Sequence, residues 1–127
     1  MDNLILASPQ ALQPSYRLVV LENALPTGQT IPLPSPPYNG ALLIGRNDLQ
    51  QGVVVDIDLS RYGGYEKKTS RKHAKITCTG NQFFVEDWES THGTYVNKER
   101  MAAGLQKPLA DGDEVRFAEL VAQFKAS

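Results

Sequence analysis

Apolar residues in this chain gather in short runs that have the character of β-strands. Residues 16–21 form one run and residues 41–45 another, and both end at polar or turn-forming residues. In residues 74–79 apolar and polar positions alternate, which is the period of a strand with one buried face. Because apolar residues rarely recur at three-and-four spacing, the pattern predicts no amphipathic helix.

Turn-forming residues separate these runs. Residues 80–81, Gly-Asn, predict a hairpin between residues 74–79 and 82–88. Residues 111–113, Asp-Gly-Asp, predict a tight turn before a terminal hairpin over residues 114–124. Many short strands with frequent turns are typical of an all-β sandwich, so this is the fold class we expect.

Two further segments complete the predicted strands. Residues 53–58 are rich in β-branched residues and predict a strand of their own. Residues 29–33 form a short run that is interrupted and followed by prolines. Proline has no backbone N–H to donate to a ladder, so the second segment is expected at a sheet edge or in a loop.

Length and composition indicate one folded domain. The chain has 127 residues, of which 41% are hydrophobic and 21% charged, so it is neither disordered nor membrane-spanning in composition. We expect a flexible leader over residues 1–15 and a domain over residues 16–127. The beginning of the chain lacks the basic and apolar regions of a signal peptide, and the single cysteine, Cys78, allows no internal disulfide. We expect a cytoplasmic protein without membrane insertion.

The charge balance argues against a general nucleic-acid binder. Thirteen basic residues stand against 14 acidic ones, for a formal net charge of −1. Non-specific nucleic-acid affinity rests on neutralising many phosphates, which needs a basic surplus. Positive charge is nevertheless concentrated locally, in five basic residues between positions 67 and 75.

Three clusters carry the candidate chemistry. They are residues 45–46 (Gly-Arg), residues 70–73 (Ser-Arg-Lys-His) and residues 90–97 (Ser-Thr-His-Gly-Thr-Tyr-Val-Asn). Each lies where a predicted strand turns, and each alone is common on protein surfaces. Together they offer guanidinium, hydroxyl and backbone donors, the groups that surround a phosphate ester in proteins. The clusters therefore predict a pocket for a phosphorylated residue.

An enzyme is the least favoured alternative. Ser70 and His73 could form a hydrolytic pair, but no Gly-x-Ser-x-Gly elbow surrounds the serine. A metal site could use the two histidines, His73 and His92, with Cys78. The Asp-x-Asp at residues 56–58 is only a fragment of a calcium loop. We expect no catalysis, no cofactor and no metal, and we interpret His73 as a structural residue.

Taken in order, the clusters resemble the forkhead-associated (FHA) domain, a phosphothreonine-peptide binding module. That family has Gly-Arg at the end of one strand, Ser-x-x-His before another, and an Asn-Gly-Thr turn followed by Val-Asn. Here these motifs are residues 45–46, residues 70–73 and residues 92–97. Residues 111–117 also look like the family's terminal hairpin, and the resemblance covers residues 16–125. It implies a two-sheet β-sandwich of about eleven short strands, FHA/SMAD-like, with the ligand loops at one end.

The resemblance also implies roles for individual residues. Phosphopeptide contacts would come from Arg46 and Ser70 at the phosphate, Arg71 beside it, and Thr91 and His92 on the opposing loop. Loop architecture would depend on three more residues, which are Gly45, His73 and Gly93. The implied partner is a phosphothreonine-containing protein, a substrate of a Ser/Thr kinase, and the implied role is protein–protein interaction in kinase signalling.

One position departs from the family pattern. The family commonly has asparagine where this chain has His92, and that amide bonds the peptide backbone near the phosphothreonine. Asparagine offers two donors and an acceptor, whereas a neutral imidazole offers one of each. An alternative function therefore stays open, in which the sandwich is a scaffold with a weakened pocket. It would then mediate phosphorylation-independent interaction or self-association.

Overall fold

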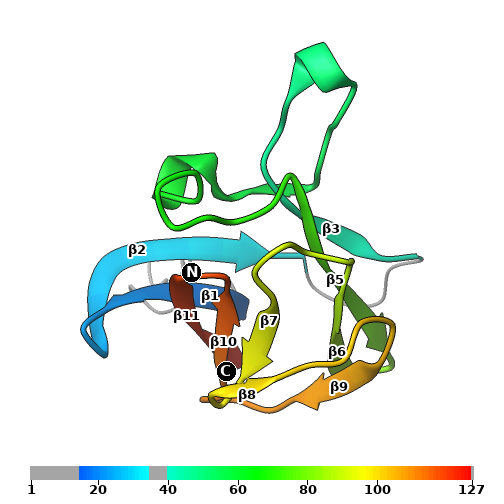
Figure 1. Ribbon diagram of the computed structural model, residues 1–127. Helices are drawn as coiled ribbons and strands as arrows, with labels where there is room; N and C mark the ends of the chain where they lie inside the picture. The colour runs from blue at the N-terminus through cyan, green and yellow to red at the C-terminus, as the bar shows by residue number, and fades with distance from the viewer. Residues whose placement is uncertain (1–14, 35–39, 127) are drawn as a thin grey trace, which may run out of the picture.

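The computed structural model describes residues 15–34 and 40–126 as a β-sandwich (Figure 1). Eleven strands form two sheets, which confirms the predicted fold class and strand number. Of the predicted leader, residues 1–14 lie outside the described part of the chain. The first strand begins at Tyr16, the predicted start of the domain.

The strands divide into a six-stranded and a five-stranded sheet. The larger sheet has the order β2-β1-β11-β10-β7-β8. Its strands are β1 (Tyr16–Glu22), β2 (Leu25–Leu33), β7 (Thr94–Val96), β8 (Glu99–Arg100), β10 (Glu114–Phe117) and β11 (Leu120–Ala126). The smaller sheet has the order β4-β3-β5-β6-β9. Its strands are β3 (Leu42–Gly45), β4 (Ile57–Asp58), β5 (Lys72–Thr79), β6 (Gln82–Asp87) and β9 (Gln106–Leu109).

The core lies between the two sheets, and in β1, β6 and β11 alternate residues are buried in it. Phe83 of the smaller sheet and Phe117 and Phe124 of the larger one are almost completely buried there. The rings of Phe83 and Phe124 are 5.3 Å apart between centroids, at a tilted angle. Burying side chains of this size stabilises the folded state by roughly 1.5–3 kcal/mol each, so this contact joins the sheets firmly.

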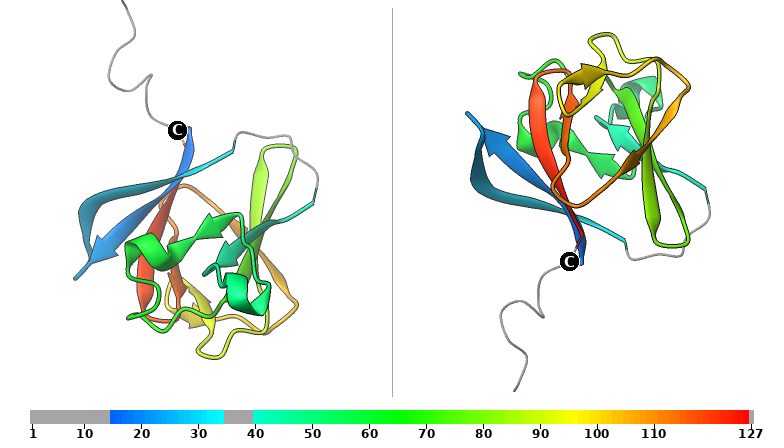
Figure 2. Two further views of the ribbon diagram at one scale, coloured as in Figure 1. Left: turned by 90° about the horizontal axis from the view of Figure 1, so that it is seen from above. Right: turned by 90° about the horizontal axis from the view of Figure 1, so that it is seen from below.

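The predicted hairpins and the predicted edge segment are both present. β5 pairs with β6 across residues 80–81, and β10 pairs with β11 in the terminal hairpin. β2 is an edge strand of the larger sheet, and Figure 2 shows it at the side of the sandwich. Pro26 and Pro32 both lie in β2, where only one side of the strand needs ladder donors.

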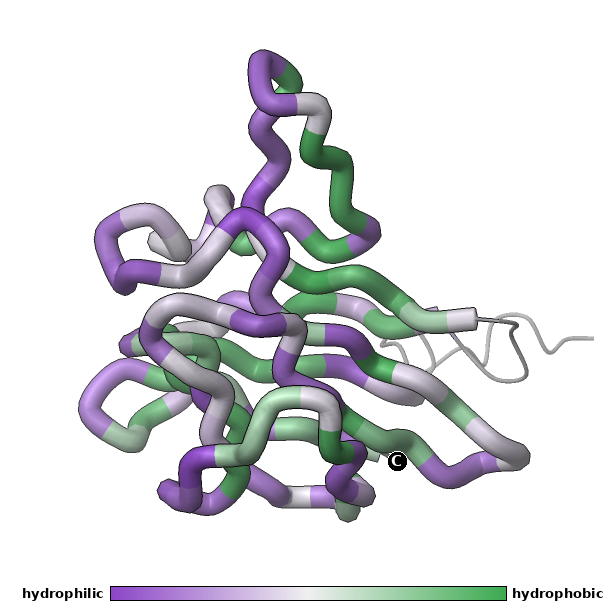
Figure 3. The backbone as a smooth tube through the Cα atoms, turned by 45° about the vertical axis from the view of Figure 1, so that its right-hand side comes forward, coloured by the Kyte–Doolittle hydropathy of each residue, from purple (hydrophilic) through white to green (hydrophobic). Residues whose placement is uncertain are grey.

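The strand predicted over residues 53–58 is wrong for most of its length. Only Ile57 and Asp58 pair with β3, in parallel, as β4. Val53 instead exchanges two backbone hydrogen bonds with Asp48, both of 2.9 Å, which closes a loop that projects from the sandwich (Figures 1 and 3). The Asp56 carboxylate accepts from the Leu43 N–H at 2.7 Å, so a side chain takes the place of a ladder partner.

A bulge at the start of β5 sets the direction of His73. Gly45 pairs with Lys72 and Ile44 pairs with Ala74, so His73 is the extra residue on β5. His73 and Ala74 both point into the core, and both are fully buried. The alternation predicted for residues 74–79 therefore begins directly after the bulge at His73. The alternating pattern itself gives no sign of that bulge.

No helix in the described part of the chain is long and apolar enough to cross a membrane. Over residues 15–34 and 40–126, no group of three or more His, Cys, Asp or Glu side chains is placed to hold a metal ion. Asp58, half of the calcium-loop fragment, accepts hydrogen bonds from the backbone N–H groups of Asn47 and Ser60.

Candidate functional site

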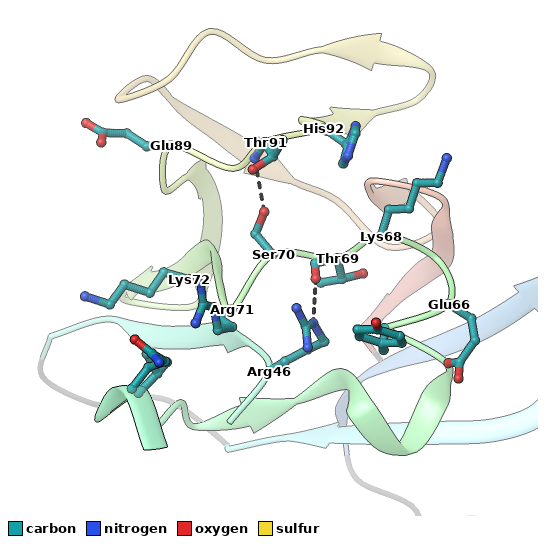
Figure 4. A pocket seen from close by; sticks show the side chains of 13 residues that line it. Arg46, Glu66, Lys68, Thr69, Ser70, Arg71, Lys72, Glu89, Thr91 and His92 are labelled. Atoms are coloured by element: carbon teal, nitrogen blue, oxygen red, sulfur yellow. Dashed lines mark hydrogen bonds between the residues drawn. The ribbon is translucent and has the colours of Figure 1, made fainter. Parts of the chain in front are cut away.

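A cleft of about 810 Å³ opens between three loops at one end of the sandwich (Figure 4). The loops are residues 46–56 between β3 and β4, residues 59–71 between β4 and β5, and residues 88–93 between β6 and β7. The five residues predicted to contact a phosphopeptide all line this cleft, and they are Arg46, Ser70, Arg71, Thr91 and His92. The structure thus brings together segments that are more than 40 residues apart.

Arg46 is held on three sides before any ligand is present. Its backbone N–H donates to Arg71 O at 3.0 Å, and its Nε donates to Thr69 O at 2.7 Å. The guanidinium carbon lies 5.2 Å from the centroid of the Tyr65 ring, which is a cation–π distance. No residue of the described chain bonds the terminal amino groups of Arg46, so they remain available to an anion in the cleft.

Ser70 connects the second loop to the third. Its Oγ accepts from the Thr91 N–H at 3.0 Å, shown as a dashed line in Figure 4. Because the hydroxyl is an acceptor in that bond, its own proton is left to donate toward the cleft. Ser70 and Thr91 thus form one unit opposite Arg46.

His73 lies beneath the cleft and joins two of its loops. Its Nδ1 accepts from the Ser70 N–H at 3.0 Å, and its Nε2 lies 2.9 Å from Gly93 O. This pattern requires a neutral imidazole with the proton on Nε2, donating to Gly93 O. Burial lowers the pKa of His73, which also favours the neutral form. Since both nitrogens are engaged, His73 is not placed to act as a base for the Ser70 hydroxyl.

The third loop is shaped by Asp87, a residue that the sequence did not single out. The buried carboxylate accepts from Ser90 Oγ at 2.6 Å and from Thr94 Oγ1 at 2.7 Å. Ser90 Oγ in turn accepts from the Gly93 N–H at 2.9 Å. Gly93 has φ +91°, and this left-handed conformation lets the loop turn back into β7.

Arg71 and His92 lie at the rim of the cleft and are more exposed than Arg46, Ser70 and His73. Arg71 Nη1 forms an ion pair with Asp48 Oδ2 at 3.0 Å, so its guanidinium is directed to the base of the projecting loop. His92 lies on the other side of the cleft, toward Lys68 (Figure 4). The structure therefore places Arg71 and His92 on opposite sides of the cleft.

The lining is positively charged although the chain as a whole is slightly acidic. Four basic side chains stand against two carboxylates, Glu66 and Glu89. Eight lining residues were not among the predicted site residues, and they are Gln51, Val53, Tyr65, Glu66, Lys68, Thr69, Lys72 and Glu89. Tyr65 gave no motif, and only its position above Arg46 shows that it belongs to the site.

Comparison with known proteins assigns the class. The family model of the FHA domain matches residues 42–118, which contain all three clusters. The FHA domain-containing protein FhaB of Mycobacterium tuberculosis is 30% identical over 121 residues, which cover 95% of this chain and 67% of that protein. The chain belongs to the FHA domain family, as the resemblance predicted.

Solved structures agree with this assignment. One comes from a structural and functional analysis of phosphothreonine-dependent FHA domain interactions. It is 25% identical, with a TM-score of 0.62, and the match covers 88% of this chain and 96% of that one. Mycobacterium tuberculosis EmbR in complex with a low-affinity phosphopeptide is 28% identical, with a TM-score of 0.64. That match covers 94% of this chain and 26% of EmbR.

Gly45 should tolerate no side chain, because the backbone of the second loop lies where its Cβ would be. A Cβ built there would collide with Arg71 O and lie 2.7 Å from Arg71 C. We expect Gly45→Ala to lower the free energy of unfolding by about 3 kcal/mol in urea denaturation. Gly52→Ala is the control, because its Cβ would meet nothing within 4 Å and only its φ of +71° is unfavourable, at about 1 kcal/mol. Equal losses for the two variants would contradict this reading of Gly45.

His73 should make stability depend on pH. Its pKa is below the ordinary 6.5, so between the two values the unfolded chain binds a proton that the folded chain does not. The free energy of unfolding should therefore fall as pH falls from 7.5 toward 5.5, measured in urea. His73→Gln should flatten this slope, because it removes the buried imidazole. An unchanged slope in His73→Gln would assign the titration to another group.

Proposed function

We propose that this FHA domain binds phosphothreonine peptides in the cleft and so links a Ser/Thr kinase substrate to the protein that carries the domain. The observation that supports this most directly is the meeting of Arg46, Ser70 and Thr91 at one place. Each is held there by a tertiary hydrogen bond to another cleft loop. Such pre-organisation lowers the entropic cost of binding a small, highly charged group.

The phosphate would lie between Arg46 and Ser70. Arg46 offers terminal N–H groups in a planar fork, which suits two oxygens of a phosphate, and Ser70 offers its hydroxyl proton. The Nε bond to Thr69 O orients the fork without consuming these donors. A phosphate dianion held in this way would also lie in the positive field of the cleft.

Arg71 would join the site by leaving its present partner. Its ion pair with Asp48 is exposed, and pairs of this kind contribute about 0–1 kcal/mol. A phosphate dianion is the stronger attraction, so the Arg71 guanidinium would turn from Asp48 toward it. Thr91 and His92, on the facing loop, would contact the peptide beside the phosphothreonine.

The relatives support the same function. One FHA structure that matches this chain was studied for phosphothreonine-dependent interactions, and EmbR was solved with a phosphopeptide. We place the domain at residues 16–127 because β1 starts at Tyr16 and pairs with the last strand, β11. The proposed module is a cytoplasmic binding domain without turnover. His73, the candidate base, is occupied by backbone groups on both nitrogens.

Arg46→Ala should weaken phosphopeptide binding at least tenfold. Charge-assisted hydrogen bonds contribute roughly 1.5–3 kcal/mol each, which corresponds to about 10- to 150-fold in Kd. Fluorescence anisotropy with the best peptide from an oriented phosphothreonine library would measure this. Arg61→Ala is the matched control, because Arg61 is exposed in a 3-10 helix and does not line the cleft. Equal wild-type affinity for the phosphorylated and unphosphorylated peptide would reject the proposal.

His92→Asn should strengthen binding about two- to tenfold. The amide adds a donor beside the peptide backbone, and one net hydrogen bond contributes about 0.5–1.5 kcal/mol. His92→Ala serves as the comparison, since it removes the ring without adding an amide. If wild type binds no phosphopeptide and His92→Asn does, the cleft of this chain is a weakened one, and the scaffold alternative is favoured.

A further inference from the structure

Beside the cleft, the larger sheet carries a tyrosine between two arginines, which we call the Arg–Tyr stack. Tyr95 of β7 is paired in register with Arg100 of β8 on one side and with Arg116 of β10 on the other. The guanidinium carbons lie 5.9 Å and 3.8 Å, respectively, from the centroid of the Tyr95 ring. The residues next to Tyr95 in β7, Thr94 and Val96, are buried, so the stack lies on the outer face of the sheet.

The two guanidinium groups are not neutralised. Within the described ranges, neither Arg100 nor Arg116 has a carboxylate at ion-pair distance. Arg116 Nη1 donates to Ala118 O at 2.9 Å, which leaves its other N–H groups unbonded by the described residues. Five other basic residues do have a carboxylate partner, and they are Lys67, Lys68, Arg71, Lys107 and Lys125.

The carboxylates nearest to the stack in sequence are those of Glu99 and Glu114, and within the described residues neither lies at ion-pair distance from Arg100 or Arg116. Glu99 precedes Arg100 but is paired with Lys107 at 3.1 Å. Glu114 lies two residues before Arg116 on the same face of β10, and its backbone bonds Asn97. Lys98, in the β7–β8 turn, adds a further positive charge nearby. The balance around the stack is therefore positive.

The stack also holds its charges in place. A guanidinium lying against an aromatic ring keeps its in-plane N–H groups free, and the contact restricts the motion of a long side chain. Ordering such a side chain otherwise costs about 0.5–1.5 kcal/mol on binding. Arg100 and Arg116 thus present pre-organised donors for an anion.

The stack is continuous with the cleft through Gly93. A Cβ built on Gly93 would lie 2.7 Å from Arg100 Nε, so the Arg100 side chain packs directly against this residue. Gly93 follows His92, which lines the cleft. Figure 1 shows β7 running from the 88–93 loop, with β8 and β10 beside it. A peptide that leaves the cleft past His92 would next reach the Arg–Tyr stack.

We propose that the Arg–Tyr stack is a second anion-binding surface, which takes the carboxylates of an acidic segment in the same phosphoprotein whose phosphothreonine occupies the cleft. This proposal rests on the proposed function and adds a partner preference to it. The guanidinium fork of each arginine would pair with a side-chain carboxylate. The domain would then prefer phosphothreonines that have Asp or Glu residues a few positions away, on the side that leaves past His92.

Peptide pairs that differ only in the acidic segment would test the proposal. Each carries one phosphothreonine and a block of three residues, either Asp or Asn, placed three to eight positions to either side. At about 3.3 Å per extended residue these positions sample roughly 10–26 Å. Wild type should bind the best Asp peptide about five- to twentyfold more tightly than its Asn twin in 0.1 M salt, and less so at higher salt.

Charge-matched variants separate the stack from the cleft. The double variant Arg100→Gln/Arg116→Gln should remove the Asp preference while leaving the affinity for the Asn peptide within twofold. Lys125→Gln/Lys107→Gln loses the same charge from residues that are already paired, and it should keep the Asp preference. Equal wild-type binding of Asp and Asn peptides, or equal losses in both double variants, would overturn the proposal.

The proposed function can fail independently of the stack. If wild type does not distinguish phosphorylated from unphosphorylated Asn peptides, then the cleft proposal fails. The stack is then tested directly by NMR, from the side-chain Nε–H signals of Arg100 and Arg116 during titration with an unphosphorylated Asp peptide. Saturable shifts that are absent with the Asn peptide would support the anion surface. No shift at millimolar peptide would reject it.

Discussion

The cleft of this FHA domain depends on one buried imidazole. His73 accepts a hydrogen bond from the Ser70 N–H and donates one to Gly93 O, so a single ring sets the spacing of the second and third loops. Gly93 O also accepts from the Ala118 N–H at 2.9 Å, which extends the connection to the β10–β11 turn. The ring must be neutral and must point inward, and the bulge in β5 supplies that direction.

Around this connection the cleft has a fixed interior and an adjustable rim. Arg46 is held by Thr69, and the Thr69 hydroxyl in turn donates to Phe117 O at 3.1 Å. The Arg46 guanidinium is thereby tied to the core of the larger sheet. Arg71 has only an exposed ion pair with Asp48, so it can change partner at little cost. This division suits the proposed function, in which a constant phosphate is bound within variable peptide sequences.

Some basic side chains near the cleft have carboxylate partners and others do not. In the second loop, Lys67 and Lys68 are paired with Glu22 of β1 and with Glu119 of the β10–β11 turn, and a backbone hydrogen bond from the Glu119 N–H to Lys67 O, of 2.9 Å, joins the loop to the same turn. These lysines therefore contribute less free charge to the cleft than their density in the sequence suggests. The positive groups without carboxylate partners in the described chain include Arg46 in the cleft and the arginines of the Arg–Tyr stack. A phosphoprotein would meet positive charge at two adjacent places.

Local sequence was sufficient to predict much of the fold and several of the residues that line the cleft. Short-range rules act within a few residues, so the turns at residues 80–81 and 111–113 and the edge position of β2 could be predicted. The ordered clusters likewise pointed to Arg46 and Ser70, because each motif is a contiguous stretch, and the structure places both residues in the lining of the cleft. The strand predicted over residues 53–58 was wrong, because the Asp56 side chain, and not its strand propensity, decides how this segment meets β3.

What only the tertiary structure decided are contacts between distant segments. The inward direction of His73, the role of Asp87 beneath the third loop, and the place of Tyr65 above Arg46 all depend on partners that no local pattern marks. The same holds for Arg100, which meets Gly93 and Tyr95 only because β7 and β8 pair in one register. The sequence by itself determined that an FHA domain forms. Packing decided which side chains are committed to the scaffold and which remain for a ligand, because a side chain's partners are set by folding and not by its neighbours in the chain.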